Sequence, residues 1–142
     1  MPTSTPGRKP SEATDAFWLC AQGPPPGRSP EPAGRGGKWL VFVSTKYVDA
    51  TWAKIKEATE AGRLGSAAKV ATARPNPNAP NPRSRVICVY TYDWKDEADV
   101  RRVREELRRL SITQKIPYKA DADTQAGKYS VRGDSGIAKY YE

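Results

Sequence analysis

The hydrophobic residues of the chain fall into short runs that predict strands. Residues 39–43 and 86–92 are rich in β-branched and aromatic side chains, which is typical of strands. The second of these runs is apolar on both faces at its start, so we expect it to be the central strand of a sheet. Weaker patterns predict further strands at 67–73, 116–119, 128–131 and 137–142.

Two other segments repeat their apolar residues at helical spacing. The apolar face of the first consists of Val48, Trp52, Ile55 and Thr59. Ser44 or Thr45 is placed to cap the start of this helix, and Gly62 is placed to end it.

The second predicted helix has a narrow apolar stripe and a crowded charged face. The stripe consists of Val100, Val103, Leu107 and Leu110. Asp93 or Asp96 can cap its start. Most of its arginines have a carboxylate three or four residues away, so the charges largely cancel. We therefore predict no nucleic-acid surface on this helix.

From residue 38 onward, the predicted order of elements is β-α-β-β-α-β-β. This order favours an α+β domain with a largely antiparallel sheet and helices on one face. Residues 1–37 are instead rich in Pro, Gly, Ser and Thr. We expect them to form a flexible arm, in which only the apolar segment 16–21 docks on the body. The folded domain then covers residues 38–142.

Composition narrows the possible functions. The 142 residues suffice for one domain and contain no apolar run near the ~18–20 residues that span a bilayer, so we expect a cytoplasmic protein with no membrane contact.

The chain has no histidine, which excludes histidine metal sites and Ser-His or Cys-His catalysis. Cys20 and Cys88 sit inside apolar runs, which fits a reducing compartment. We predict neither a metal nor a cofactor.

The net charge of +8 is least opposed between residues 61 and 92, which contain no Asp or Glu. The cations of this stretch are Arg63, Lys69, Arg74, Arg83 and Arg85. Arginine forks match phosphate oxygens and lysine adds a mobile charge, so we predict that the stretch holds a phosphate-bearing ligand. The loop at 74–83 adds the hydrogen-bonding side chains Asn76, Asn78 and Asn81. The alternative is a solvated loop that proline merely stiffens.

Further candidates flank this stretch. Tyr90, Tyr92 and Trp94 lie at a strand end, where aromatic side chains either stack on bases or close a core. Lys69 interrupts an apolar strand between small neighbours, where loss of hydration can make a lysine a general base, although it can equally reach water from a sheet edge. A second cluster consists of Tyr118, Lys119, Lys128, Tyr129 and Arg132.

Several blocks of sequence are distinctive: GKWL at 37–40, EAGRL at 60–64, AKV at 68–70, VICVYT at 86–91, YKAD at 118–121 and GKY at 127–129. Over most of 37–132 the chain thereby resembles the Bles family, named after basophilic-leukaemia-expressed protein. The resemblance implies a fold similar to translation initiation factor 4E, a curved antiparallel sheet backed by helices. Such a factor stacks its cap ligand between tryptophans and grips the phosphates with Arg and Lys.

The resemblance also implies a possible enzyme. Bacterial relatives are described as phosphothreonine lyase domain proteins, in which a strand lysine removes the α-proton and a histidine protonates the leaving phosphate. Lys69 stands where that base lysine would stand. Because the chain has no histidine, the acid would have to be Tyr90, Tyr118 or Lys119.

Three hypotheses follow. The leading one is binding of a phosphorylated small molecule, a nucleotide or RNA through the basic stretch, with Lys128 and Arg132 as additional contacts. The second is β-elimination at a phosphoryl ester, with Lys69 as base and Arg74, Arg83 or Arg85 on the phosphate. The third is a protein–protein adaptor that contacts its partner through the segment from Phe17 to Ala21 or through the proline-rich loop.

Overall fold

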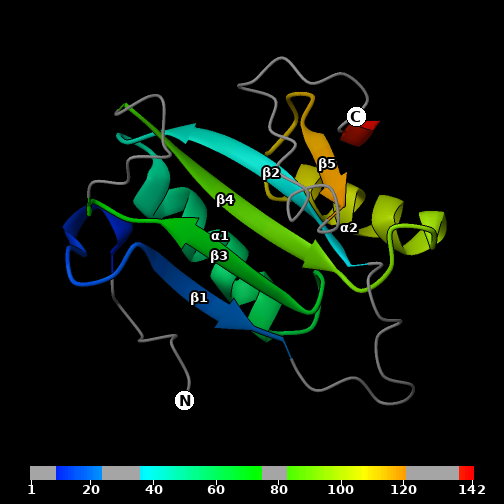
Figure 1. Cartoon of the computed structure of the whole chain (residues 1–142), viewed down its shortest axis with the longest axis horizontal. Helices are drawn as coiled ribbons and strands as arrows, with labels where there is room; N and C mark the ends of the chain where they lie inside the picture. Colours follow the sequence, from blue (N-terminus) through cyan, green and yellow to red (C-terminus); the bar gives the residue numbers. More distant parts are fainter. Residues whose placement is uncertain (1–8, 24–35, 75–82, 121–137) are drawn as a thin grey trace.

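The computed structural model describes residues 9–23, 36–74, 83–120 and 138–142, which form a six-stranded sheet and two α-helices (Figure 1). The strands are β1 (Trp18–Gln22), β2 (Gly37–Ser44), β3 (Ala67–Ala71), β4 (Ser84–Thr91), β5 (Pro117–Ala120) and β6 (Ala138–Tyr141). The helices are α1 (Val48–Glu60) and α2 (Glu97–Arg109), and a short 3-10 turn covers Pro10–Glu12.

The strands lie in the order β1-β3-β4-β2-β5-β6, and every neighbouring pair is antiparallel. β4 lies in the interior of the sheet between β3 and β2, as predicted for the most apolar run. From β2 to β6 the elements follow the predicted order β-α-β-β-α-β-β, so the α+β class is confirmed. The strand predicted at 128–131 lies outside the described residues.

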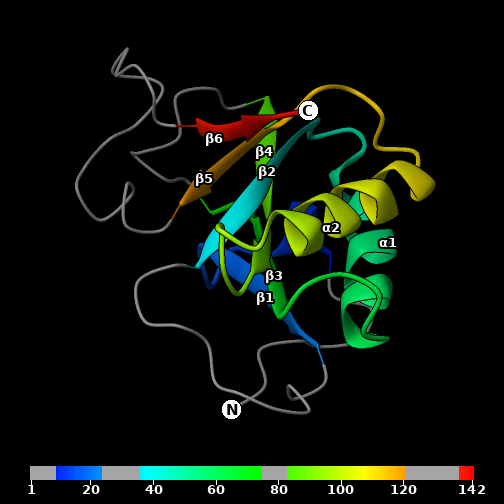
Figure 2. The same ribbon diagram turned by 90° about the vertical axis from the view of Figure 1, so that its right-hand side faces the viewer.

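Both helices pack on the same face of the sheet, and the core lies between the two layers (Figure 2). Its fully buried members include Trp39, Val41, Ile87 and Val89 from the sheet and Ile55, Val100, Val103 and Leu107 from the helices. Each such side chain contributes about 1.5–3 kcal/mol through its loss of contact with water. The Trp39 indole also donates a hydrogen bond from Nε1 to the carbonyl oxygen of Val100 at 3.0 Å, which ties β2 to α2.

The two helices begin in different ways. The Asp96 side chain accepts a hydrogen bond from the backbone N–H of Asp99 at 3.2 Å, so the predicted cap of α2 is confirmed. The predicted cap of α1 is wrong, because its N-cap is Tyr47 and no side chain caps the helix there. Ser44 instead accepts a hydrogen bond from the N–H of Lys46 and closes the turn before α1.

Gly62 ends α1, as predicted. Its φ of 80° is left-handed, a conformation that glycine adopts without a steric penalty. The N–H of Gly62 bonds the carbonyl of Thr59, and the N–H of Arg63 bonds the carbonyl of Ala58. This pair of hydrogen bonds is the Schellman motif, which satisfies the last carbonyls of the helix. Neither helix combines the length and apolar character that spanning a bilayer requires.

The described part of the N-terminal region belongs to the sheet. The predicted docking segment is β1, an edge strand that pairs with β3 and buries Leu19 and Ala21 in the core. Ala13, which precedes it, is also buried at 3% exposure. The thirteen-residue helix α1 packs against β1 and the 3-10 turn, so residues 9–23 complete the same core as the predicted domain. The remainder of the predicted arm, 1–8 and 24–35, lies outside the described residues.

Candidate functional site

The face of the sheet opposite the helices, called here the open face, carries the cations. Residues paired across antiparallel strands point to the same side, and side chains alternate along each strand. Because Val70, Ile87 and Val41 form one such set on the helix side, their sequence neighbours point to the open face. The register places there Trp18, Cys20 and Gln22 of β1, Ala67, Lys69 and Ala71 of β3, Val86, Cys88 and Tyr90 of β4, Lys38, Leu40 and Phe42 of β2, and Lys119 of β5.

One row across the open face is polar and basic. Ala67 pairs with Tyr90, Tyr90 with Lys38, and Lys38 with Lys119. The Nζ of Lys38 lies 5.6 Å from the centroid of the Tyr90 ring, which is a cation–π contact. Lys38 and Lys119 are only 9% and 8% exposed, so both side chains are almost fully buried.

A second row, two residues further along the strands, centres on Lys69. Lys69 pairs with Cys20 on one side and with Cys88 on the other. Its Nζ lies 4.0 Å from the centroid of the Trp18 ring, so the side chain leans along the sheet toward β1. Cys88 is buried and Cys20 is half-buried, and both are free thiols. Lys69 therefore stands among small, weakly polar neighbours.

A third row, at the opposite end from Lys38, is apolar. Trp18 pairs with Ala71, and Phe42 pairs with Val86. Phe42 is 51% exposed, which is unusual for a phenylalanine in the middle of a sheet. The open face thus changes from aromatic and apolar at one end to basic at the other.

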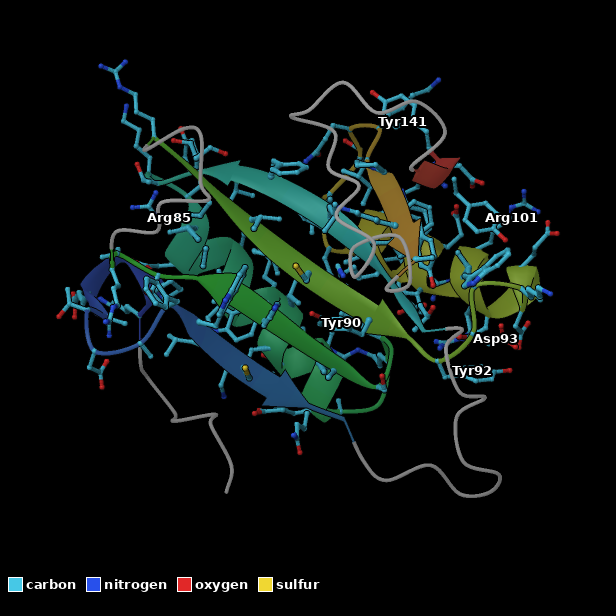
Figure 3. The ribbon with its side chains drawn as sticks, in the orientation of Figure 1. Arg85, Tyr90, Tyr92, Asp93, Arg101 and Tyr141 are labelled. Atoms are coloured by element: carbon cyan, nitrogen blue, oxygen red, sulfur yellow. The ribbon has the colours of Figure 1, made fainter. Side chains whose placement is uncertain are left out.

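No described strand contains an aspartate or a glutamate. Lys38, Lys69 and Lys119 therefore lie on strands that contain no carboxylate. Asp93, which is 8% exposed, follows β4 and lies beyond its end, beside Tyr92 (Figure 3). Within the described part of the chain, no group of three His, Cys, Asp or Glu side chains is placed to hold a metal ion.

The arginines of α2 differ from these lysines because their own element also carries carboxylates. They form ion pairs with carboxylates of the same helix, as predicted: Arg101 with Glu97, Arg102 with Asp99, Arg108 with Glu105, and Arg109 with Glu106. Arg104 differs from the others because its guanidinium is fully buried. The exposed surface of α2 is therefore electrostatically self-compensated.

The arginines of the predicted basic stretch do not gather around Lys69. Arg85 pairs with Val43 at the opposite end of β4 from Tyr90, and its side chain lies on the helix side of the register (Figure 3). Arg74 stacks on the Phe17 ring at 4.5 Å and donates a hydrogen bond to the carbonyl of Asp15. Arg83 is exposed at the start of β4, and its carbonyl accepts from the N–H of Thr45. Asn76 and Asn78 lie outside the described residues.

The predicted aromatic candidates also separate. Tyr90 lies on the open face, whereas Tyr118 is fully buried beneath the sheet, 2.5 Å from the Thr91 hydroxyl. Tyr92 points toward α2 and donates a hydrogen bond to the Asp96 carboxylate, which is the main cause of its raised pKa. Trp94 is partly buried against the core. Lys128 and Arg132 lie outside the described residues.

Sequence reasoning missed Lys38 and Trp18 as members of the site. Lys38 precedes an apolar strand and Trp18 lies in the segment assigned to an arm, so neither stands out in a scan for charge clusters. Lys38 becomes a neighbour of Lys119 and Tyr90 only through the register of β2 with β5 and β4. The place of Lys38 at the start of the apolar run 39–43 was the one available signal for it.

Comparison with solved structures supports the fold. A crystal structure of schistosome eIF4E complexed with m7GpppA and 4E-BP matches with a TM-score of 0.54 at 19% sequence identity. The match covers 76% of this chain and 59% of that one, so the chain spans somewhat more than half of its length. At this level of identity, the likeness shows the fold alone. It confirms the expected similarity to initiation factor 4E.

Comparison with protein families agrees with the motifs. Residues 33–127 match the family described as "Basophilic leukemia-expressed protein Bles03". This range contains β2 to β5, both helices and the lysines of the open face. The chain therefore belongs to the Bles03 family.

Proposed function

We propose that the protein binds a phosphate-bearing ligand, a nucleotide or RNA, on its open face. Lys69 is half-buried and supplies a direct positive contact for the phosphates, whereas Lys38 and Lys119 are buried and add to the positive field of the same face. Tyr90 and Trp18 lie beside Lys38 and Lys69 and supply aromatic surfaces for a base. The observation that carries the proposal is the presence of three lysines on one face of a sheet whose described strands contain no carboxylate.

The chemistry of the face supports this ligand class. Lysine is a compact point charge that binds phosphate without requiring a fixed geometry. The basic row and the aromatic row are four residues apart along the strands, or about 13 Å. A molecule with a flat apolar part and a charged part can use both rows. The eIF4E structure of similar fold was solved with m7GpppA, which is a ligand of that kind.

The positions of the tryptophans argue against a cap-binding site in which two tryptophans stack on the ligand. Of the four tryptophans in the chain, Trp39 and Trp52 are buried in the core at 0% and 2% exposure. Trp94 packs partly against the core, so Trp18 alone lies on the open face. We therefore expect m7GpppA and GpppA to bind with dissociation constants within about threefold of each other, because no tryptophan pair distinguishes a methylated base.

A salt titration tests the proposal. Filter binding of a single-stranded RNA and of mononucleotides is measured from low to moderate salt. Phosphate contacts predict binding at low salt that weakens with a linear log–log slope. Absence of binding to both classes of ligand at low salt would show that the proposal is wrong.

A matched pair of variants locates the site. Lys69→Met removes a cation from the open face but keeps the length of the side chain. Lys54→Met makes the same change on the exposed surface of α1, in the other layer. We expect Lys69→Met to reduce the salt slope for single-stranded RNA by about 0.7. Lys54→Met should leave it unchanged, and equal slopes in both variants would contradict binding at the open face.

The other two hypotheses stay predictions. Elimination at phosphothreonine would use Lys69 as base. Because Tyr118 and Lys119 are both buried, Tyr90 is the better placed of the three predicted acids. Incubation with a phosphothreonine peptide should then release phosphate, and an unchanged peptide mass would end that hypothesis. An adaptor role through Phe17 to Ala21 would use β1, an edge strand of the sheet, and predicts a co-purifying protein partner.

A further inference from the structure

We infer that the outer edge of β1 is a docking site for an extended, acidic peptide segment of a partner protein, which adds to the sheet as a further antiparallel strand. This inference goes beyond the proposed function, because it concerns a protein partner and not a phosphate-bearing ligand. Its basis is that β1 turns a row of backbone groups away from the sheet, while a lysine of β3 leans over its side chains.

The hydrogen bonds between β1 and β3 fix which backbone groups of β1 face outward. The N–H of Thr72 donates to the carbonyl of Phe17, and the N–H of Gly23 donates to the carbonyl of Ser66, each at 3.0 Å. In an antiparallel ladder, residues that bond the neighbouring strand alternate with residues whose N–H and C=O point the other way. The residues of β1 whose backbone groups point away from β3 are therefore Trp18, Cys20 and Gln22.

The strand β1 lacks the features that usually protect the edge of a sheet. Edge strands are commonly kept from pairing by charged side chains, by proline or by a bulge. The strand Trp18–Gln22 contains no charged residue and no proline, and its register with β3 is regular throughout. At the other edge of the described sheet, the pairing of β6 with β5 is irregular between Tyr118 and Lys119. Of the two edges, β1 is therefore the better suited to accept a further strand (Figure 1).

The side chains beside this edge indicate the charge of the partner. The Nζ of Lys69 lies 4.0 Å from the centroid of the Trp18 ring, so this half-buried side chain leans from β3 over β1. Arg74, which follows β3, stacks on the ring of Phe17 at 4.5 Å, just before β1. Neither β1 nor β3 contains a carboxylate. A carboxylate on a strand that docks beside β1 can therefore form a charge-assisted hydrogen bond with Lys69.

The antiparallel arrangement decides where the side chains of the partner would lie. Its backbone would run about 4.8 Å from that of β1. Residues paired across antiparallel strands point to the same side, so those opposite Trp18 and Cys20 would lie on the open face, where a glutamate can reach toward Lys69. The residue between them would lie on the helix side, beside the buried Leu19, where an apolar side chain fits. The edge therefore selects a segment in which acidic and apolar residues alternate.

A second copy of this chain fits the same edge less well. A symmetric dimer would pair β1 with β1 of the second copy, and this strand contains no carboxylate. The Lys69 side chains of both copies would then lean toward the junction on one face of a continuous sheet, where like charges repel. A partner of opposite charge avoids this repulsion. We therefore assign the edge to an acidic peptide and not to a dimer.

Synthetic peptides test the docking mode by calorimetric titration of the full chain, without any phosphate-bearing ligand. The probe is the end-blocked peptide TVEVEVT, whose glutamates would lie on the open face and whose valines would lie on the helix side. N-methylation of both glutamates removes N–H groups that would donate to β1, so affinity should fall at least about tenfold. N-methylation of the first two valines alters N–H groups that point away from β1 and should change affinity less than about threefold. Equal losses, or no binding of the unmodified peptide, would overturn the inference while leaving the proposed function intact.

A double-mutant cycle tests the role of Lys69. The quantity measured is the preference of the chain for TVEVEVT over TVQVQVT, in which glutamine replaces glutamate. Lys69→Met should reduce this preference at least about threefold, because the carboxylate loses its partner. Lys54→Met lowers the net charge equally but lies on the exposed surface of α1, so it should change the preference less than about 1.5-fold. Equal reductions would mean that general attraction, and not Lys69, favours the acidic peptide.

Cys20→Pro completes the test from the side of the protein. Proline is tolerated on an edge strand where its missing N–H would have faced outward, as that of Cys20 does. The variant should keep its circular dichroism spectrum and bind TVEVEVT at least about tenfold more weakly. A folded Cys20→Pro that binds the peptide as tightly would overturn the inference. So would sedimentation of the full chain as a dimer that Cys20→Pro abolishes, because a second copy would then occupy the edge.

Discussion

Arg104 is fully buried, which is rare for an arginine. Its guanidinium donates hydrogen bonds to three carbonyl oxygens, those of Glu142 at 2.7 Å, Ile112 at 2.9 Å and Gln114 at 2.7 Å. Burial lowers the pKa of the guanidinium, and the nearby Arg108 lowers it further. The three hydrogen bonds offset this unfavourable environment. They link α2 to the segment that follows it and to Glu142, the residue after β6.

Replacement of Arg104 should therefore be costly. Arg104→Met removes the charge and takes the Arg104 donor from the carbonyls of Ile112 and Gln114, so we expect the free energy of unfolding to fall by about 3 kcal/mol. Arg109→Met is the control, because that side chain is 75% exposed and pairs only with Glu106 along the helix. It should change the free energy by less than about 0.5 kcal/mol. Denaturant midpoints at an unchanged slope measure both, and equal midpoints would contradict the role of Arg104.

Tyr92 gives a prediction about pH. Its hydroxyl donates to Asp96, and this hydrogen bond, with the nearby carboxylates, raises the pKa of Tyr92 above its usual 10.0. A raised pKa in the folded state means that the contribution to stability is complete below pH 10.0 and is lost as the pH rises through the folded-state value. Burial also raises the pKa of Tyr140, so ultraviolet titration should show at least two tyrosines that ionise late, and Tyr92→Phe should remove one of them.

Asp96→Asn separates the carboxylate charge from the helix cap. Asparagine caps a helix about as well as aspartate, so α2 should keep its start. The loss of the negative charge should bring the ionisation of Tyr92 back toward 10.0. A late-ionising tyrosine that persists in Asp96→Asn but is absent from Tyr92→Phe would show that another group raises the pKa.

The contrast between Arg104 and its neighbours shows where residue-scale prediction stops. The paired arginines of α2 were predictable because their carboxylate partners lie three or four residues away in the sequence. The partners of Arg104 are backbone carbonyls up to thirty-eight residues away. Because every residue has a backbone carbonyl, the sequence does not reveal which ones accept these hydrogen bonds. Its place next to the stripe of Val100, Val103 and Leu107 was the only available signal.

Among the elements, the turn between α1 and β3 depends on two glycines for different reasons. Gly62 needs a left-handed φ of 80°, whereas Gly65 lacks room for a side chain. A Cβ on Gly65 would overlap the carbonyl oxygen of Tyr90, which belongs to the backbone of β4 and cannot turn aside. The turn is therefore packed directly against the strand that carries the aromatic ring of the basic row.

Alanine at the two glycines should have unequal effects. Gly62→Ala should lower the free energy of unfolding by about 1 kcal/mol, since it adds only left-handed strain. Gly65→Ala should lower it by roughly 3 kcal/mol, because the new methyl group must move a strand. Thermal unfolding compares the two directly. A Gly65→Ala variant as stable as Gly62→Ala would show that β4 can yield at this point.

Element prediction succeeded where one face of an element carried the signal. The stripes of α1 and α2 and the apolar runs of β2 and β4 were visible because each buries a face at a regular spacing. The start of α1 was not predictable from capping residues, because its N-cap is Tyr47 and no side chain caps the helix there. The role of β1 as an edge strand was equally hidden, because its partner β3 lies some fifty residues later in the chain.

At the scale of the whole molecule, the order of the strands rather than the order of the sequence assembles the site. The prediction centred the site on the stretch from 61 to 92 and added Lys119 from a second cluster. The sheet separates Arg74 and Arg85 from Lys69, places Lys119 on the same face as Lys69, and adds Lys38 from β2. A cluster that arises from five strands in non-sequential order can be predicted only when the register of the strands is known. The absence of carboxylates from these strands was visible in the sequence. The placement of their lysines on one face of the sheet was not.

The distribution of charge gives a last prediction at this scale. Lys38→Met with Lys69→Met and Arg101→Gln with Arg109→Gln each lower the net charge of +8 by two. If long-range attraction alone drew RNA to the protein, the two double variants would lose affinity equally. Because the arginines of α2 are paired with carboxylates and both lysines lie on described strands that contain no carboxylate, we expect at least about a tenfold loss for the lysine pair and less than about twofold for the arginine pair. Filter binding of one single-stranded RNA at fixed low salt measures both. Equal losses would mean that the net charge, and not the open face, governs binding.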